Sequence, residues 1–208
     1  MRYAVNMSAE IPRRTRLTPT ARKQAILTTA AEHFASLPFT DVSVSAIATD
    51  LGVSVALVHK YFQSKNGLFA AVLSTWLADV AVVQQRELDE VVSTAPKQDR
   101  VTAWVRGYLL GLAALPSDKA RRQVLHGHDD ADATAVRARA AERNAQKLSE
   151  IVAPNVSERD RYALLAGVGA MTAVAAQWAE KGCPEQQIWP AISAVVGAIH
   201  GSLGDWQR

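Results

Sequence analysis

Hydrophobic residues recur along most of the chain at intervals of three and four positions, which is the spacing of one face of an α-helix. The clearest stripe runs through Val101, Trp104, Val105, Tyr108, Leu109 and Leu112. Another runs through Leu68, Val72, Trp76 and Val80. No segment shows the sustained alternation of apolar and polar residues that is typical of a strand. The pattern predicts an all-α fold of about nine helices joined by short connections.

Hydroxyl residues stand where most of these helices are predicted to begin. Thr18 is followed by Pro19, which places a capping hydroxyl before a proline at the first helical position. Serines precede five further helices, at Ser43, Ser54, Ser64, Ser117 and Ser157. Prolines and glycines mark predicted ends, at Pro38, Gly52, Pro116, Gly127, Pro154 and Gly182. We expect three short helices, a long fourth helix that contains the domain boundary, and a larger helical second half.

Residues 43–62 have the features of a helix-turn-helix. Ala48 is small enough for two helices to approach each other, and Gly52 tolerates a positive φ in the turn. The apolar residues expected to face inward are Ile47, Leu51, Val53 and Val58. The opposite side then presents Ser54, Val55, Leu57, His59, Lys60 and Tyr61 to a partner. Hydroxyls and a lysine suit phosphate oxygens, and apolar tips suit thymine methyl groups.

The stretch from Ala21 to Leu73 resembles the N-terminal domain of TetR-family (tetracycline-repressor-like) transcriptional regulators. The resemblance lies in the A-E-x-F ending of the first helix at 31–34 and in Val44, Ile47 and Ala48. It continues through the turn at 51–54 and through Tyr61, Phe62, Ser64, Lys65 and Leu68. It implies a helix-turn-helix domain over 18–72, and an effector-binding and dimerisation domain over 73–208. The function implied is that of a sequence-specific repressor that a small-molecule effector releases from its operator.

The resemblance also implies which residues contact double-stranded DNA, at an operator that is palindromic or nearly so. Those expected at the major groove or its flanking phosphates are Ser54, Val55, Ala56, Leu57, His59, Lys60 and Tyr61. Lys65 matches a frequent phosphate contact at a helix N-terminus. Ser43 lies where the second helix begins near the DNA backbone.

Four positions depart from the usual family pattern. Many relatives have Lys or Thr and then Gly where this chain has Val55 and Ala56, and an aromatic residue where it has His59. Gly67 replaces the acidic residue that would complete a capping box with Ser64. Because Lys60 is the one cation on the predicted reading face, we expect modest direct base readout and a contribution from DNA shape.

The charge distribution favours an anionic partner for the N-terminal part. Residues 1–65 hold eight Lys or Arg and four Asp or Glu, whereas residues 66–208 hold fifteen and sixteen. We expect residues 1–17 to form a mobile basic arm, with Met7 as an alternative start to Met1. The single cysteine, Cys183, and the lack of an apolar stretch in the first sixteen residues predict a cytoplasmic protein without a secretory signal.

The last two predicted helices are apolar and rich in small residues, which allows close helix packing. In the family the helices that these resemble form a four-helix bundle across a two-fold axis, so we expect a homodimer. The residues predicted at the interface are Leu164, Val168, Ile192, Val195 and Ile199. Burial of this surface inside one subunit is the alternative.

The second half also contains candidates for a ligand site. Aromatic and thioether side chains that could line an effector pocket, or simply fill the core, are Trp76, Trp104, Tyr108, Met171 and Trp178. Residues 126–130 (HGHDD) resemble metal ligands by type. They lie at a predicted helix junction, where His and Asp are expected for dipole reasons, so we predict no metal and no cofactor.

Two other classes of function remain as alternatives at this stage. An enzyme would need a nucleophile–base pair or a ligand cluster, and only 126–130 resembles one. A membrane-associated protein is suggested by the uncharged run Tyr162–Ala179 and by Ile188–Gly204, but the first is dominated by Ala and Gly and the second contains Pro190. We therefore predict neither an enzyme nor a membrane protein. Within the regulator hypothesis, an activator is the alternative to a repressor.

Overall fold

The computed structural model describes residues 18–127, 130–152 and 157–204, which form nine α-helices and two short 3-10 helices without a strand. The N-terminal elements are α1 (Pro19–Ser36), η1 (Phe39–Asp41), α2 (Val44–Asp50), α3 (Val55–Phe62) and α4 (Lys65–Asp89). The remaining elements are α5 (Lys97–Ala113), α6 (Asp118–Leu125), α7 (Ala131–Val152), α8 (Glu158–Glu180), η2 (Glu185–Gln187) and α9 (Ile188–Leu203). The predicted all-α class and helix number are confirmed. The predicted arm at 1–17 lies outside the described residues.

The predicted capping residues begin their helices. Thr18 Oγ1 accepts a hydrogen bond from the Ala21 amide at 3.2 Å, with Pro19 in the first turn. Ser43, Ser54, Ser64 and Ser117 cap α2, α3, α4 and α6 through their side-chain oxygens. Ser157 forms a full capping box with Asp160 at the start of α8. Each of these bonds satisfies an amide that the helix itself leaves unpaired.

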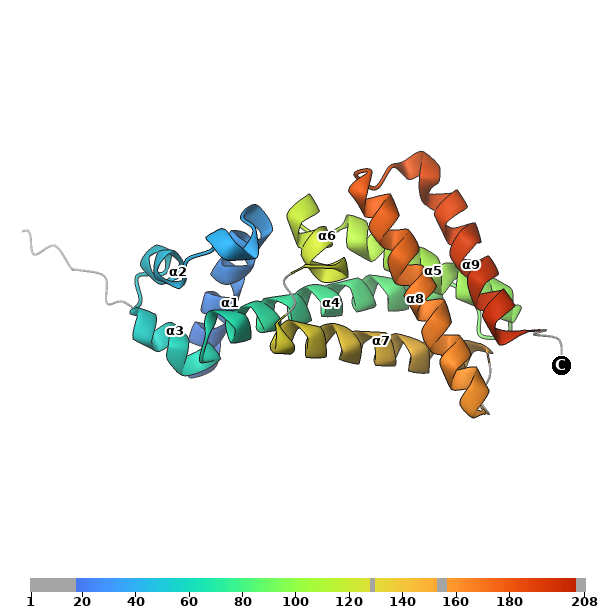
Figure 1. Ribbon diagram of the computed structural model, residues 1–208, viewed down its shortest axis with the longest axis horizontal. Coiled ribbons are helices and arrows are strands. Elements are labelled where there is room, and N and C mark those ends of the chain that lie inside the picture. The colour runs from blue at the N-terminus through green and yellow to red at the C-terminus, as the bar shows by residue number, and fades with distance from the viewer. Residues whose placement is uncertain (1–17, 128–129, 153–156, 205–208) are drawn as a thin grey trace, which may run out of the picture.

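The N-terminal helices pack around a small aromatic core. The rings of Phe34 and Phe39 each contact that of Phe69, with centroids 5.0 and 5.2 Å apart. Ile26 and Ile47 are fully buried beside them. Because Phe69 belongs to α4, the first turns of the long helix complete this core. Figure 1 shows α1 to α3 at one end of an elongated molecule, with α4 leading away from them.

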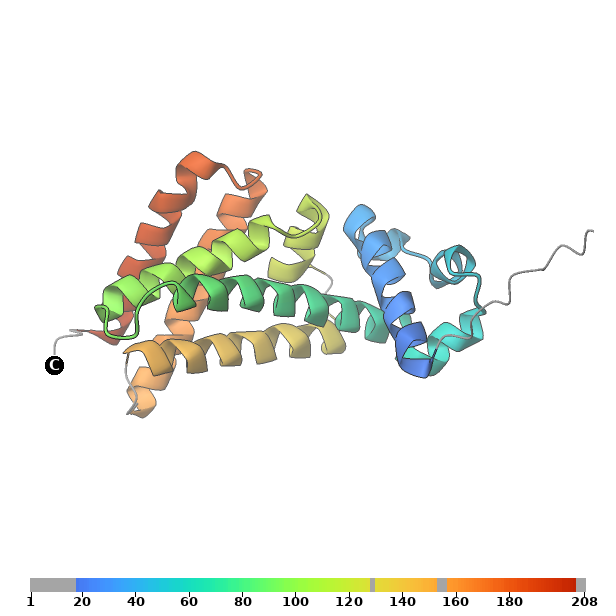
Figure 2. The same cartoon turned by 180° about the vertical axis from the view of Figure 1, so that it is seen from behind.

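The C-terminal domain is built on the rest of α4. Figure 2 shows α5 and α7 lying along α4 on opposite sides. Glycines allow the close approach of α5: a Cβ at Gly107 would lie 2.6 Å from the Cα of Gln84, and one at Gly111 would lie 2.9 Å from that of Val80. These contacts explain two glycines inside a helix, where each costs about 1 kcal/mol relative to alanine. Helices α8 and α9 pack against each other and cover the far end.

Among the described residues, two helices are long and apolar enough to cross a membrane by length and composition, α4 and α8. In both, 44% of the most apolar window is buried inside the protein. Core helices of soluble proteins have the same properties. The apolar run of α8 therefore agrees with the predicted burial in a helical core.

Candidate functional site

The turn between α2 and α3 has the backbone geometry that the sequence predicts. Gly52 has a φ of +62°, in the region that favours glycine. The Val53 amide donates to the Ala48 carbonyl at 2.9 Å, and the Gly52 amide donates to the Thr49 carbonyl at 2.9 Å. This pair of bonds is a Schellman cap, which ends α2 and sets the direction of the chain into α3. Ala48 itself is buried, which leaves room for the helix crossing.

Helix α3 has one buried side and one open side. Val58 and Phe62 are buried in the N-terminal core. The predicted reading-face residues fall into two groups: Ser54, Val55, Ala56, His59 and Lys60 are exposed, and Leu57 and Tyr61 are half-buried. The structure therefore brings all seven onto the outer side and flanks of one short helix. Ser43 is also exposed, and its Oγ caps α2 by accepting from the Ala46 amide at 3.4 Å.

His59 is held in one orientation by its own helix. Its Nδ1 lies 3.1 Å from the Gln63 carbonyl oxygen. A carbonyl only accepts, so Nδ1 carries the hydrogen and donates it. The Nε2 atom is then left to face an external group, as an acceptor when the ring is neutral and as a donor when it is charged. A histidine presented in this way can bind either a base edge or a phosphate.

Lys65 lies differently from the family-based expectation of a free phosphate contact. Its Nζ donates to the Thr40 carbonyl at 3.2 Å and lies 4.4 Å from the centroid of the Phe39 ring. Burial is the main cause that lowers the pKa of this ammonium, and the nearby Asp41 carboxylate partly opposes it. The side chain thus ties the start of α4 to η1. Its role at a phosphate stays a prediction.

Gly67, which departs from the family pattern, is explained by a close backbone approach. A Cβ at this position would lie 2.3 Å from the Phe62 carbonyl oxygen. Its amide donates to Ser64 Oγ at 2.9 Å, so the serine caps α4 without an acidic partner. The larger side chain of a capping box would force α3 and α4 apart at this turn.

The C-terminal domain contains a cleft between α4, α5, α7 and α8. It consists of two adjoining hollows of about 160 and 350 Å³ that share Leu77, Tyr108, Ala140 and Asn144 in their linings. The first is also lined by Val80, Gln84, Trp104, Arg143 and Lys147. The second extends to Val124, Leu125, Arg137, Val168 and Thr172. Together they have the size typical of small-molecule sites.

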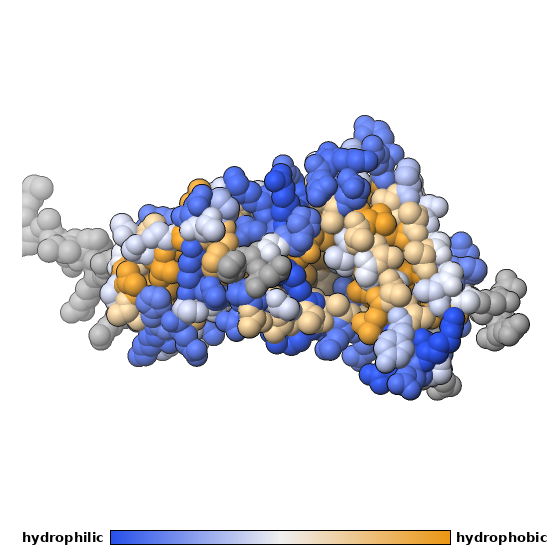
Figure 3. Space-filling model, in the orientation of Figure 1, coloured by the Kyte–Doolittle hydropathy of each residue, from blue (hydrophilic) through white to orange (hydrophobic). Residues whose placement is uncertain are grey.

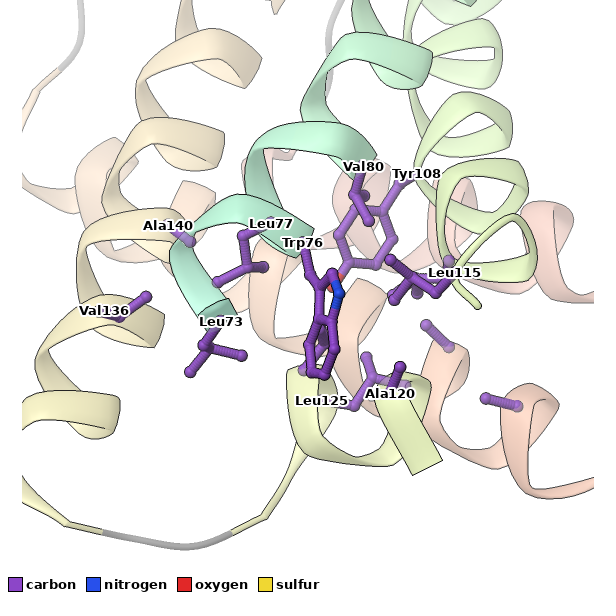
Figure 4. Packing of buried hydrophobic residues seen from close by; sticks show 14 of the residues in the cluster. Leu73, Trp76, Leu77, Val80, Tyr108, Leu115, Ala120, Leu125, Val136 and Ala140 are labelled. Carbon is purple, nitrogen blue, oxygen red and sulfur yellow. The ribbon is translucent and has the colours of Figure 1, made fainter. Parts of the chain in front are cut away.

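Two of the five residues predicted for an effector pocket line this cleft. Trp104 borders the first hollow, and Tyr108 borders both. Trp76 points from α4 towards Leu125 and Ala120 of α6, where it fills core (Figure 4). Met171 is fully buried and lines neither hollow.

Trp178 has a structural role instead. Its Nε1 donates to the Pro184 carbonyl at 3.0 Å and fixes the turn between α8 and η2. For Trp76, Met171 and Trp178 the structure therefore favours the alternative that they fill the core.

Tyr108 stands where the two hollows meet. Burial raises the pKa of its phenol to about 12, and an interaction with the Thr172 side chain partly opposes this rise. Thr172 Oγ1 itself donates to the Val168 carbonyl at 3.0 Å. Tyr108 is thus a neutral group at the junction of the two hollows.

The polar lining of the cleft was not predicted from the sequence. Gln84 is 3% exposed, and its Nε2 has no hydrogen-bond partner among the described residues. Arg143 and Lys147 belong to α7, whose charges follow the pattern of a solvated helix face. No local signal distinguishes the charges that border a cleft from those that face solvent. Only the packing of α7 on α4 brings these groups together.

The five residues predicted at the dimer interface are inside the subunit. Leu164, Val168, Ile192, Val195 and Ile199 are each at most 3% exposed. The opposite sides of α8 and α9 are open, and they carry apolar and small residues: Leu165, Ala166, Gly169, Ala173, Trp189, Ala194 and Gly197. Figure 3 shows pale and orange surface over these two helices. Residues other than those predicted therefore form the face that a partner could reach.

The motif at 126–130 is a helix start in the residues that the structure describes. Asp130 Oδ1 accepts from the amides of Asp132 and Ala133 at 2.8 and 3.0 Å, which caps α7. His128 and Asp129 lie outside the described residues, and His126 is exposed. Within the described ranges, no group of three metal-binding side chains comes together.

The N-terminal helices are similar to those of a known protein family. Residues 26–72 match the family of bacterial regulatory proteins called the tetR family. A TetR-like transcriptional regulator from Rhodococcus sp. RHA1 has the same fold, with 22% identity and a TM-score of 0.61; the match covers 88% of this chain and 96% of that one. No curated protein matches the chain.

Two further solved structures show how widely the fold is shared. A tetR-family regulator from Streptomyces coelicolor is 17% identical, with a TM-score of 0.66 over 89% of this chain and 80% of that one. FadR from Bacillus subtilis, solved in complex with stearoyl-CoA, is 14% identical, with a TM-score of 0.66 over 85% and 99%. The expected architecture, a TetR N-terminal domain followed by a helical C-terminal domain, is confirmed.

We expect Lys65→Met to lower the free energy of unfolding by about 1 kcal/mol, because it removes a hydrogen bond and a cation–π contact. Lys60→Met is the matched control: Lys60 is exposed on α3, so its effect should stay within about 0.5 kcal/mol. Urea denaturation of both variants measures the difference. Equal effects would show that the Lys65 ammonium does not tie α4 to η1.

Proposed function

We propose that this chain, whose residues 26–72 match the tetR family of bacterial regulatory proteins, is a cytoplasmic DNA-binding repressor that a small molecule releases from its operator. The observation that carries the proposal is the open side of α3 on a turn fixed by Gly52 and the Val53–Ala48 hydrogen bond. The protein acts by binding rather than by catalysis. A small-molecule role is supported by the cleft and by FadR, a protein of similar fold that was solved with stearoyl-CoA.

Recognition of DNA uses the exposed groups of α3. The cap Ser54 and the first helical residues, Val55 and Ala56, approach base edges in the major groove, as in other helix-turn-helix proteins. Lys60 supplies a phosphate contact, and the free Nε2 of His59 supplies a second polar one. With so few directional groups, sequence preference depends partly on the shape of the DNA.

The active form is a homodimer joined through the open sides of α8 and α9. A Cβ added at Gly169 or Gly197 would meet no neighbouring atom within 4 Å. The backbone at both positions is therefore accessible to a second pair of helices. Trp189, 60% exposed, and Leu165, 45% exposed, add apolar surface on the same side. A two-fold dimer carries two copies of α3, which can then reach half-sites about 34–36 Å apart.

Coupling between the cleft and α3 has two physical connections. The first is α4, which lines the cleft with Leu77 and enters the N-terminal core with Phe69. The second is α6, where Ser117 Oγ donates to the Ala35 carbonyl at 2.5 Å and Gln123 Nε2 donates to the Phe34 carbonyl at 2.6 Å. These carbonyls belong to the last turn of α1, which has no partners of its own for them.

Release follows if a ligand binds more tightly to an arrangement of α4 and α6 in which the two α3 helices no longer match the half-sites. The coupling free energy in such systems is typically about 1–3 kcal/mol. The ligand then removes the protein from DNA by mass action.

The test is fluorescence anisotropy with the DNA upstream of the protein's own gene, over a salt series and with random DNA as the control. We expect tight binding that exceeds random binding and weakens steeply with salt, because phosphate neutralisation releases counterions. Lys60→Ala should reduce the magnitude of the salt slope by about 1 for each subunit, and so by about 2 for the dimer. Lys119→Ala, at an exposed lysine on α6, is the matched control and should leave it unchanged. Equal affinity for both DNAs would contradict sequence-specific regulation.

We expect Ala194→Glu to dissociate the dimer, because it places a charge in the middle of the proposed apolar interface. Val82→Glu is the matched control, since Val82 is 68% exposed on α4, away from that face. Sedimentation velocity should give twice 22.5 kDa for the native chain and the control, and 22.5 kDa for Ala194→Glu. A monomeric native chain, or a dimeric Ala194→Glu variant, would overturn the interface.

A further inference from the structure

The first hollow of the cleft is bordered by a buried hydrogen-bond donor, the Gln84 side-chain amide, that has no acceptor among the described residues. The Gln84 side chain is 3% exposed, and its Nε2 has no partner among the described residues. An unpaired buried N–H costs free energy, so native proteins rarely keep one unless a water or a ligand satisfies it. Gln84 lines the hollow from α4, opposite α7. The amide therefore points to a ligand that brings a hydrogen-bond acceptor.

The other polar groups of this hollow add positive charge. Arg143 lines it and forms no ion pair in the part of the chain that the structure describes. Lys147, one turn further along α7, lies 3.4 Å from Glu150 and is partly exposed. No carboxylate lines either hollow. Glu87, one turn beyond Gln84 on α4, is paired with Arg106 at 2.7 Å and is thereby neutralised.

Most of the other side chains that line the cleft are apolar, although Asn144 borders both hollows. Leu77, Val80 and Trp104 line the first hollow with hydrocarbon and ring surface. Beyond Tyr108 the second hollow is bordered by Leu125 and Val168. Thr172 Oγ1 already donates to the Val168 carbonyl at 3.0 Å, and burial keeps the Tyr108 phenol neutral. Arg137 is held by the Gln123 carbonyl at 2.6 Å.

We propose that the cleft binds an organic monoanion, a carboxylate with an apolar alkyl or aryl tail. The carboxylate accepts from Gln84 Nε2 and pairs with Arg143 and Lys147, and the tail passes Tyr108 towards Val168. This assignment rests on the proposed function, because it names the class of effector for the same cleft. A cation would meet unpaired donors and like charge, and a neutral alcohol would leave Arg143 unused.

The experiment is isothermal titration calorimetry of the full-length chain with four probes. Octanoate and 4-phenylbutyrate are the anions, and 1-octanol and 4-phenylbutan-1-ol are their uncharged matches. We expect each carboxylate to bind at least tenfold more tightly than its alcohol. Gln84→Met and Arg143→Gln should each weaken carboxylate binding about tenfold and leave alcohol binding unchanged. Arg122→Gln, at an exposed arginine on α6 that lines neither hollow, is the matched control and should change neither.

A stability measurement separates ligand binding from a structural role of Gln84. Since Gln84→Met removes an unsatisfied buried donor at similar volume, its Tm should equal or exceed that of the native chain while its affinity for carboxylates falls. Equal affinity for acids and alcohols, equal losses for both in the variants, or no binding of either carboxylate at millimolar concentration would overturn the proposal.

DNA binding of the same samples distinguishes this proposal from the proposed function. If the protein binds the DNA upstream of its own gene specifically but prefers the alcohols, only the proposal of a carboxylate ligand is contradicted. A chain that binds carboxylates through Gln84 and Arg143 but no specific DNA contradicts the regulatory function and leaves the anion site standing.

Discussion

Helix α4 belongs to the hydrophobic cores of both halves of the protein, and the other functional features depend on that continuity. Its first turns bury Leu68 and Phe69 among α1, η1 and α3, and its later turns bury Trp76 and Val80 against α5 and α6. Gly107 and Gly111 bring α5 so close that α4 cannot shift there without moving α5 as well. An ordered helix of 25 residues therefore joins the two halves, and a change around Gln84 at one end is mechanically connected to α3 at the other.

The second connection joins α7 to α1 through hydrogen bonds of α6. Ser117 and Gln123 hold the last turn of α1, and the Arg137 side chain of α7 holds the Gln123 carbonyl. A ligand that displaces α7 would therefore be connected to α1 through α6 as well as through α4. Because both connections end on the core shared by α1, α2 and α3, our account predicts that these helices rotate together rather than that α3 rearranges alone.

Interactions between residues close in the chain could be predicted from the sequence, whereas contacts between distant residues could not. The helix starts at Ser43, Ser54, Ser64 and Ser157 could be predicted because a cap bonds to an amide three residues away. Gln84, Arg143 and the tie from Lys65 to Thr40 could not, because their partners are distant in the chain. The dimer prediction shows the same limit: periodicity in α8 and α9 identified the strongest apolar stripe, which covers the subunit's own core, while small residues such as Gly169 and Gly197 occupy the open side.

The central claim is that a ligand in the cleft changes the spacing of the two α3 helices. It is tested most directly by pulsed electron–electron spin resonance on the dimer, with a spin label at Glu32→Cys in a Cys183→Ser background, since Glu32 is exposed on α1 and Cys183 is the only other cysteine. The protein bound to its operator should be compared with the protein saturated with a carboxylate that releases it. Our account predicts two distinct inter-label distances. Identical distance distributions in the two states would contradict it.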